Sequence, residues 1–332
     1  MFGRRSQMAA KPSVAAPFTI AVLPDTQQEL WNQTTIHDNF DGRLTWLAAN
    51  KQSLNLKYMV HVGDVHDTDN LIFSSDPLVN PRYIPGWPID HYQYYWASEA
   101  FNIIENAGIP YILANGNHDS GAVCGGPACP IVPGQTQETW IEVRNTSTWN
   151  MFYPPSRFPG MVTYETNKSE NSYRTFESGG LKWLVLVLEL WPRTEIVNWA
   201  KTVLVSHLDH NVIISTHSYL DSSGTISTSN GGYGANSPRY VFDNLLKIYP
   251  NVRFVFCGHV GTSAYRVDTG NNGNKIYSML NCYHDTTNNF IRLLDIDVAD
   301  NSLETKVYSP RTNYYRTGSA DAFTITGIDW VR

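Results

Sequence analysis

Short clusters of Asp, Asn, Gln and His residues stand at four places along this 332-residue chain, each after a run of apolar residues. The clusters are Pro24-Asp25-Thr26-Gln27, Gly63-Asp64-Val65-His66-Asp67, Gly116-Asn117-His118-Asp119 and Gly258-His259-Val260-Gly261. The runs before them are Phe18–Leu23, Leu56–Val62, the shorter Ile109–Ala114, and Val252–Cys257. Such runs, bounded by turn residues, indicate buried strands. Carboxylate, amide and imidazole groups at the ends of successive strands form a metal site, so we expect strand ends that meet around a cation.

Apolar runs alternate with amphipathic stretches through the first half of the chain, which indicates a βα pattern. Two predicted helices, Phe40–Leu54 and Gln93–Ala107, lie between the first three predicted strands. In the second helix, the helical period places Trp96 and Ile104 on one face, and Gly108 ends the helix. Strands separated by helices favour a partly parallel sheet with helices on its outside.

The second half of the chain is richer in strands. A Gly179-Gly180 hairpin turn separates the predicted strands Tyr173–Glu177 and Leu181–Leu190. Helices are predicted at Thr194–Ser206 and Ser237–Ile248. Further strands are predicted at Asn211–Thr216, Val252–Cys257, Ala264–Val267, Lys275–Cys282, Phe290–Val298 and Leu303–Tyr308. The pattern predicts an α/β fold, a four-layer αββα sandwich of two mixed sheets, with residues 17–332 as a single domain after a flexible tail at residues 1–16.

The charge balance and the apolar runs limit the partners of this chain. The net charge is −6 and the pI about 5.9, which argues against a broad electrostatic surface for nucleic acid. A phosphate substrate is compatible with this charge, because bound metal ions can supply positive charge locally. No apolar run approaches the ~20 residues of a membrane span. The stretch Ser13–Pro17 is too short for a signal-peptide core, and cellular location and oligomeric state stay open.

The four cysteines fall into two pairs with different surroundings. Cys124 and Cys129 lie in a turn-rich Gly/Pro loop, where a disulfide would indicate an extracellular or virion-associated location. The alternative is two unpaired loop thiols, which would be open to oxidation. Cys257 and Cys282 lie in apolar strand-like segments, where buried cysteine acts as a small hydrophobic residue.

Two predicted loops are long enough to suggest a role in binding. Leu71–His91 is rich in proline and aromatic residues, and Asp221–Asn236 is rich in glycine and serine. Loops beyond about 12–15 residues are usually functional or disordered. Because both begin close to one of the polar clusters, we expect them to form rims of a substrate pocket, the alternative being surface decoration.

The polar clusters, in this order, resemble the motifs of the calcineurin-like metallophosphoesterases from Phe18 to about Val298. Gly116-Asn117-His118-Asp119 is the most specific of these motifs, and His217 after its predicted strand matches the lone histidine of the fourth. The first motif usually reads Asp-x-His and the last Gly-His-x-His, whereas here Gln27 and Gly261 stand at the second histidine of each. The Asp-Thr-Gln start is similar to a branch of uncharacterised bacterial and phage members.

The resemblance implies a centre in which two divalent ions are bridged by one carboxylate, clamp the phosphate oxygens and activate a water. Carried over position by position, Asp64 would bridge the ions. One complete site would be formed with Asn117, His217 and His259. The other would take Asp25 and Gln27.

Gln27 and Gly261 both stand at positions that supply ligands to the same ion in the family. We therefore expect one site that binds its ion strongly and one that binds weakly. Gln27 can offer an amide oxygen, a hard ligand that favours Mn among the candidate ions Mn, Zn, Fe, Mg and Ca. His284, His66 or a water is left to fill the remaining position.

The resemblance also implies the catalytic groups. His118 would stand beside the scissile bond, where an imidazolium can protonate the leaving alkoxide or stabilise charge on the phosphoryl oxygens. Asp67 would hold His118 in its protonated, oriented form. His66 is expected to face solvent.

The sequence therefore predicts a metal-dependent phosphoesterase that acts on a small-molecule or polymer ester, with diesters favoured. The alternative is a catalytically degenerate binding module on a phage particle or cell surface, because one site is altered and aromatic residues are abundant. Nuclease activity is disfavoured by the acidic charge, and phosphoprotein phosphatase activity by Thr68, where those enzymes carry Arg-Gly after the aspartate. The chain has neither a Gly-x-Ser-x-Gly elbow nor a Gly-rich nucleotide loop.

Overall fold

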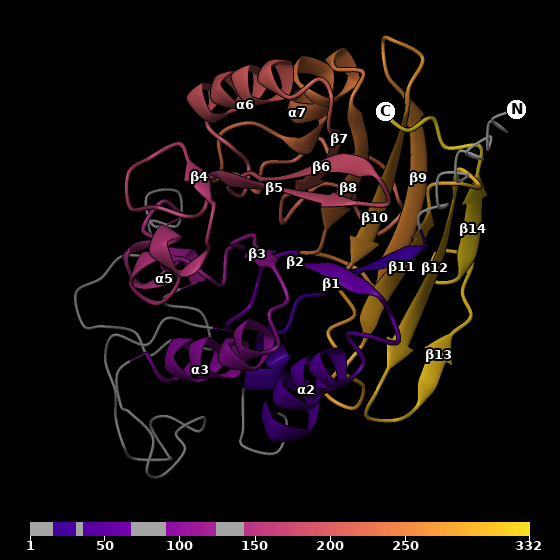
Figure 1. Ribbon diagram of the computed structural model, residues 1–332. Coiled ribbons are helices and arrows are strands. Elements are labelled where there is room, and N and C mark those ends of the chain that lie inside the picture. The colour runs from indigo at the N-terminus through magenta and orange to yellow at the C-terminus, as the bar shows by residue number, and fades with distance from the viewer. Residues whose placement is uncertain (1–15, 31–35, 68–90, 124–142) are drawn as a thin grey trace, which may run out of the picture.

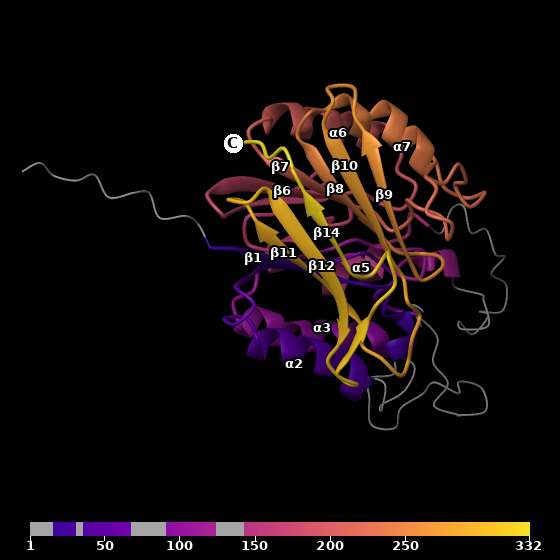
Figure 2. The same cartoon turned by 90° about the vertical axis from the view of Figure 1, so that its right-hand side faces the viewer.

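Two seven-stranded sheets pack face to face in the computed structural model, which describes residues 16–30, 36–67, 91–123 and 143–332 (Figure 1). Helices α2 (Gly42–Ala49) and α3 (Tyr92–Asn106) lie on one side of the sheets. Helices α6 (Thr194–Ser206) and α7 (Pro238–Asn244) lie on the other (Figure 2). This arrangement confirms the predicted four-layer αββα sandwich of two mixed sheets.

The first sheet contains the strands that carry three of the polar clusters. Its order is β13 (Tyr314–Arg316), β12 (Ser302–Ser309), β11 (Ile291–Asp297), β1 (Phe18–Leu23), β2 (Leu56–His61) and β3 (Tyr111–Leu113), with β14 (Phe323–Thr326) paired to β12. Strands β1, β2 and β3 are parallel, so their carboxyl ends lie at one edge.

The second sheet also has a parallel centre. Its order is β4 (Val162–Thr163), β5 (Ser172–Ser178), β6 (Leu181–Val187), β7 (Asn211–Ser215), β8 (Val252–Cys257), β10 (Lys275–Asn281) and β9 (Ser263–Thr269). Strands β6, β7, β8 and β10 are parallel, and β5 joins β6 through the predicted Gly179-Gly180 hairpin.

Shorter helical segments connect these elements. They are 3-10 turns at Gln27–Leu30, Gly121–Val123, Pro155–Arg157 and Leu246–Ile248, a π-helical turn at Ile36–Asp41, and α5 (Ser147–Phe152). None of the described helices combines the length and the apolarity needed to cross a membrane.

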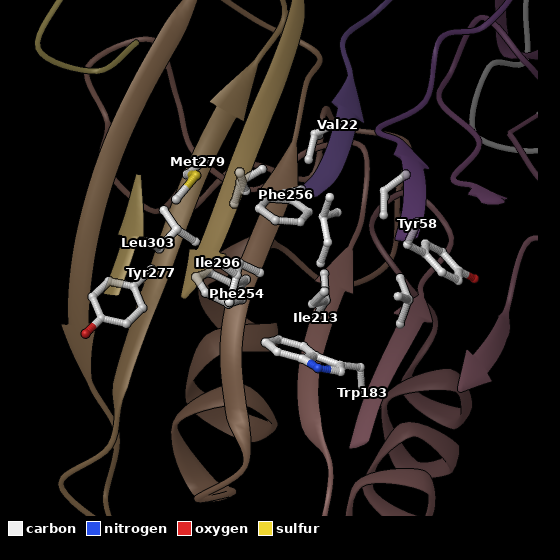
Figure 3. Packing of buried hydrophobic residues seen from close by; sticks show 14 of the residues in the cluster. Val22, Tyr58, Trp183, Ile213, Phe254, Phe256, Tyr277, Met279, Ile296 and Leu303 are labelled. Atoms are coloured by element: carbon white, nitrogen blue, oxygen red, sulfur yellow. The ribbon is translucent and has the colours of Figure 1, made fainter. Parts of the chain in front are cut away.

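The strand residues divide between two apolar layers, because successive side chains point to opposite faces of a sheet. On β1, Val22 lies between the two sheets, whereas Leu23 packs with the residues of α2 and α3. Trp183 of β6 and Phe254 and Phe256 of β8 fill the layer between the sheets, and all three are fully buried (Figure 3). Apolar burial of this extent fixes the two sheets against each other.

The structure agrees with the predicted elements most closely where the apolar pattern is strongest. The bounds of β1, β8 and α6 are those predicted. The predicted helix Phe40–Leu54 is shorter, because α2 ends at Ala49 and turns follow it. The short strands β4, β13 and β14, whose side chains are largely exposed or half-buried, are absent from the prediction.

Several predictions concern parts of the chain outside the described residues. These are the tail at residues 1–16, of which only Ala16 is described, the Cys124–Cys129 disulfide, and the loop Leu71–His91 apart from His91. The described cysteines, Cys257 and Cys282, are buried and free. The single domain at residues 17–332 stays a prediction.

Candidate metal centre

The carboxyl ends of six parallel strands from the two sheets bring the polar side chains together. The strands β1, β2 and β3 of the first sheet are followed by Asp25, Asp64 and Asn117, respectively. The strands β7, β8 and β10 of the second sheet are followed by His217, by His259, and by the pair Cys282 and His284. Ligand sites in α/β sheets characteristically lie outside the carboxyl ends of the strands.

The first cluster of metal-ligating groups contains Asp64, His217 and His259. One ligand atom from each lies within 4.8 Å of the others. The Nδ1–H of His217 donates to the carbonyl of Val62 at 3.1 Å, which leaves Nε2 facing Asp64 Oδ2 at 3.0 Å. An imidazole nitrogen and a carboxylate oxygen this close require a proton or a cation between them.

The pKa values in this cluster also indicate that a positive charge is needed between His217 and Asp64. Burial alone would lower the pKa of His217, but the carboxylates of Asp64 and Asp25 raise it to about 9. Burial also opposes ionisation of Asp64, yet His217 and His118 hold its pKa well below the usual range. Burial and the nearby His217 lower the pKa of His259 to about 4. Without a metal, the cluster therefore holds a proton on His217 and leaves His259 neutral.

The second cluster contains Asp25, Cys282 and His284. Asp25 Oδ2 lies 3.3 Å from His284 Nε2, and it accepts hydrogen bonds from Cys282 Sγ at 3.2 Å and from the backbone N–H of His259 at 2.9 Å. The side chain of Gln27 contacts the first cluster, because its amide Nε2 donates to Asp64 Oδ2 at 3.4 Å. Burial raises the pKa of Asp25.

Several buried polar atoms at the carboxyl ends of the strands lack a hydrogen-bond partner that a bound cation would supply. Three oxygen atoms have no hydrogen-bond partner among the described residues: Asp25 Oδ1, Gln27 Oε1 and Asn117 Oδ1. Unsatisfied buried polar atoms are rare in folded proteins and commonly mark a missing ion or water. Oxygen and imidazole donors are also the ligands that Mn, Fe and Zn use.

The backbone is strained where it carries these groups. Asp64 and His259 adopt left-handed conformations, with φ of 49° and 78°. A Cβ on Gly258 would stand 1.8 Å from Asp25 Oδ1, so only glycine allows the His259 turn to approach Asp25. Such strain persists where surrounding structure enforces it, and it is concentrated at functional sites.

The predicted catalytic pair lies beside the first cluster. The backbone N–H of His118 donates to Asp64 Oδ1 at 3.0 Å, which anchors the residue next to the proposed bridging carboxylate. The ring Nδ1 lies 2.7 Å from the carbonyl oxygen of Asp67 and 3.6 Å from its carboxylate. Asp67 therefore holds the imidazole mainly through its backbone, and the opposite ring nitrogen, Nε2, is available to a substrate.

His66 is not the solvent-facing residue that we expected. Its side chain is fully buried and stacks on Tyr94 with a ring separation of 3.7 Å. Its ring nitrogens lie 2.8 Å from Asp119 Oδ1 and 2.9 Å from the hydroxyl of Tyr153. Because both nitrogens have protein partners, we exclude His66 from the ligand positions left open by Gly261.

Asp119 fastens the turns after β2 and β3 to each other. Its carboxylate accepts backbone hydrogen bonds from Val65 at 3.2 Å, His66 at 3.0 Å and Gly116 at 2.8 Å, in addition to its contact with the His66 ring. These turns carry Asp64 and Asn117–His118. Asp119 therefore sets the spacing of groups that it does not touch.

A cavity of about 170 Å³ opens beside His259. Its walls are formed by Trp191, by Ser218 and by residues of the loop Asp221–Asn236, including Ser227 and Ser229. The indole of Trp191 packs edge to face on the His259 ring at 5.3 Å. The serine-rich loop is thus a rim of the candidate site, as we expected from its length.

Comparisons with known proteins identify the family and the fold of this chain. The profile of the calcineurin-like phosphoesterase family matches residues 18–262. The uncharacterized protein YvnB of Bacillus subtilis (strain 168) is 24% identical in an alignment of 332 positions. The alignment covers 95% of this chain and 22% of YvnB. The chain therefore spans only about a fifth of that relative. The structure of purple acid phosphatase PPD1 from yellow lupin (Lupinus luteus) seeds shares the fold, with a TM-score of 0.54, 12% identity, and coverage of 95% of this chain and 55% of that one.

Sequence reasoning missed three contributors to the site. Cys282 was expected to be only a small buried hydrophobic residue, but its sulfur contacts Asp25. A Cys-x-His pair that begins at the last residue of the predicted strand Lys275–Cys282 was the available signal. Trp191 and Asp119 were given no role, although Asp119 belongs to the most specific motif.

The role of Asp119 leads to a prediction. In Asp119→Asn, an NH₂ group replaces one acceptor oxygen and faces backbone donors, so the free energy of unfolding should fall by about 2–4 kcal/mol. Urea denaturation followed by circular dichroism measures this change. The control Asp209→Asn removes an exposed ion pair with Lys182 and should leave the midpoint nearly unchanged. An Asp119→Asn midpoint equal to that of the wild type would contradict the structural role.

Proposed function

Because the chain belongs to the calcineurin-like phosphoesterase family, we propose that it is a phosphodiesterase that uses divalent metal ions held at the edge where the strand ends meet. The observation that supports this most strongly is the convergence of Asp64, His217 and His259 within 4.8 Å, with unpartnered Asn117 Oδ1 beside them. When bound, divalent ions polarise the phosphoryl group and lower the pKa of an attacking water.

Two arginines near Trp191, within the described part of the chain, are already paired with carboxylates. Arg144 and Arg193 lie behind Trp191, where Arg144 donates to the carbonyl of that residue at 2.7 Å. Both guanidinium groups pair with the buried carboxylate of Glu189, at 3.4 Å and 2.9 Å. Since Arg193 also pairs with Glu165 at 2.9 Å, two carboxylates already balance the two arginines, which are therefore poorly placed to balance a phosphate as well.

In the proposed reaction, His118 protonates the leaving group. Its Nδ1–H donates to the carbonyl of Asp67 at 2.7 Å, which fixes the ring orientation and leaves Nε2 pointing to the substrate side. When the ring is protonated, Nε2–H gives its proton to the departing alkoxide oxygen. The Asp67 carboxylate at 3.6 Å stabilises the imidazolium electrostatically.

The preference for diesters rests on the cavity next to His259. A phosphodiester carries two organic groups, one that leaves and one that stays on phosphorus. The 170 Å³ cavity between Trp191 and Ser229 offers the second group an aromatic wall and hydroxyl groups. A phosphomonoester would leave this space unused.

One departure from the family pattern favours a second candidate function. Gly261 stands where the family has a metal-binding histidine, which is the change expected in a protein that keeps the fold but has lost turnover. Such a binding module would hold a phosphorylated or glycan ligand through the cavity beside Trp191. Its binding would not depend on metal.

Hydrolysis of bis(p-nitrophenyl) phosphate and p-nitrophenyl phosphate by chelator-stripped protein tests the proposed function. We expect divalent metal to restore activity, with a higher kcat/KM for the diester. Asp64→Asn and His217→Ala should abolish turnover, and His118→Ala should lower kcat by about 10²–10⁴-fold.

Matched controls for these variants are Asp209→Asn and His37→Ala, which change exposed side chains and should keep wild-type activity. Full activity in folded Asp64→Asn protein would refute the proposal. An absence of turnover with every metal, together with ligand binding that survives chelation, would support the binding module instead.

The cavity gives a prediction about substrate preference. Ser229→Phe places a ring at the exposed rim of the cavity, so kcat/KM for the diester should fall about tenfold, while that for the monoester changes little. Ser223→Phe, in the exposed turn of the same loop, serves as the control. Equal losses for both substrates would show that the cavity does not hold the second ester group.

A further inference from the structure

The position of the missing family histidine is blocked in this structure. Gly261 has a φ of 73°, and a Cβ built on it would lie 2.9 Å from Ser222 Cβ and 3.1 Å from Ser222 Cα. A side chain at residue 261 would therefore displace the loop that forms the cavity wall. An imidazole for the second ion has to come from another part of the chain.

The turn after β10 brings such an imidazole to the same edge. Strand β10 pairs in parallel with β8, with Leu280 opposite Cys257, so the residues after both strands emerge side by side. The backbone N–H of Cys282 donates to the carbonyl of Thr262 at 2.9 Å, which ties the turn to the segment next to Gly261. The chain then bends back through left-handed Tyr283 and His284, with φ of 61° and 36°.

Three ligand atoms converge at the end of this turn. Asp25 Oδ2 lies 3.2 Å from Cys282 Sγ and 3.3 Å from His284 Nε2, and the sulfur and the nitrogen are 3.4 Å apart. A tetrahedral zinc ion, with bonds of about 2.3 Å to sulfur and about 2.0–2.1 Å to nitrogen and oxygen, separates such ligand atoms by roughly 3.3–3.6 Å. The observed triangle fits this geometry closely.

A nucleophilic Cys-His-Asp triad is a poor explanation of the same residues. In a triad, one ring nitrogen faces the nucleophile and the other faces the carboxylate. Here a single nitrogen, His284 Nε2, faces both Cys282 Sγ and Asp25 Oδ2. The imidazole cannot relay a proton in this arrangement, whereas convergence on one point is what a metal ligand set requires.

A simple hydrogen-bonded cluster also leaves part of the site unexplained. Thiol and imidazole N–H groups could both donate to Asp25 Oδ2. Asp25 Oδ1 and Gln27 Oε1 would nevertheless stay buried without a partner among the described residues. A cation bound at Asp25 accounts for the convergence of the thiol and the imidazole, and Gln27, two residues further along the same turn, can supply its unpartnered amide oxygen.

We propose that His284 and Cys282, with Asp25 and the amide oxygen of Gln27, hold the second metal ion in place of the histidine missing at Gly261. This inference rests on the proposed metal-dependent function. It changes the expected metal, because a sulfur ligand favours Zn, Fe or Co over the Mn suggested by Gln27 alone. The weak site predicted from sequence thereby becomes a complete ligand set of different chemistry.

Cobalt(II) substitution of the full chain tests the ligands without relying on activity. The wild-type protein should bind about two Co²⁺ ions and show the near-ultraviolet charge-transfer band of a cobalt–thiolate bond. Cys282→Ser, a nearly isosteric change, should abolish the band. His284→Ala should reduce the bound metal to about one ion per chain, measured by elemental analysis.

The controls separate Cys282 from the other cysteines. Cys257→Ser on β8 and the double variant Cys124→Ser/Cys129→Ser should both keep the band. His37→Ala should keep the full metal content, and circular dichroism verifies that each variant is folded. Should His284→Ala fail to fold, His284→Phe, which keeps a ring but has no ligand atom, replaces it, and Cys282→Ser gives an independent answer.

The outcomes distinguish this inference from the proposed function. A band that persists in Cys282→Ser, or an unchanged metal content in folded His284→Ala or His284→Phe, would overturn the ligand assignment even in an active phosphodiesterase. Binding of two ions with the band, in a protein without turnover on any ester, would instead retain the ligands and overturn the function.

Discussion

The apolar packing between the two sheets is the constraint on which the rest of the structure depends. Trp183, Phe254 and Phe256 are completely buried in that layer and fix β6 and β8 against the first sheet. The packing aligns the carboxyl ends of parallel strands from both sheets at one edge. Polar residues with left-handed backbone conformations, such as Asp64 and His259, are tolerated there because the scaffold beneath them is rigid. The site is therefore a consequence of how the sheets meet.

Sequence patterns predicted the scaffold better than the details of the site. Continuous apolar runs mark β1 and β8, since strands buried on both faces have no polar alternation. The polar residues after them were identified because short turns keep them next to a strand end. The environment of His66 was predicted wrongly, because burial depends on Tyr94 and Tyr153, which are distant in sequence. Cys282 was missed for the same reason, since β10 and β1 belong to different sheets and the packing of those sheets brings Cys282 to Asp25.

The altered motif at Gly261 packs tightly against its surroundings. The chain has glycine at residue 261, and the loop around Ser222 occupies the space that a histidine would need. That loop also forms the wall of the cavity beside Trp191. In the proposed second site, the imidazole comes from His284, whose Nε2 lies 3.3 Å from Asp25 Oδ2. The loss of one ligand, the shape of the cavity and the new ligand position are thus linked by packing.

The most direct test of this account is a crystal structure of the protein grown with Zn²⁺, with anomalous scattering used to locate the ions. The account predicts one peak among Asp64, His217 and His259, at about 2.0–2.2 Å from their ligand atoms, and a second among Asp25, Cys282 and His284. If the protein is saturated with zinc and the anomalous map has no peak at the carboxyl ends of the parallel strands, the central claim of a metal centre is contradicted.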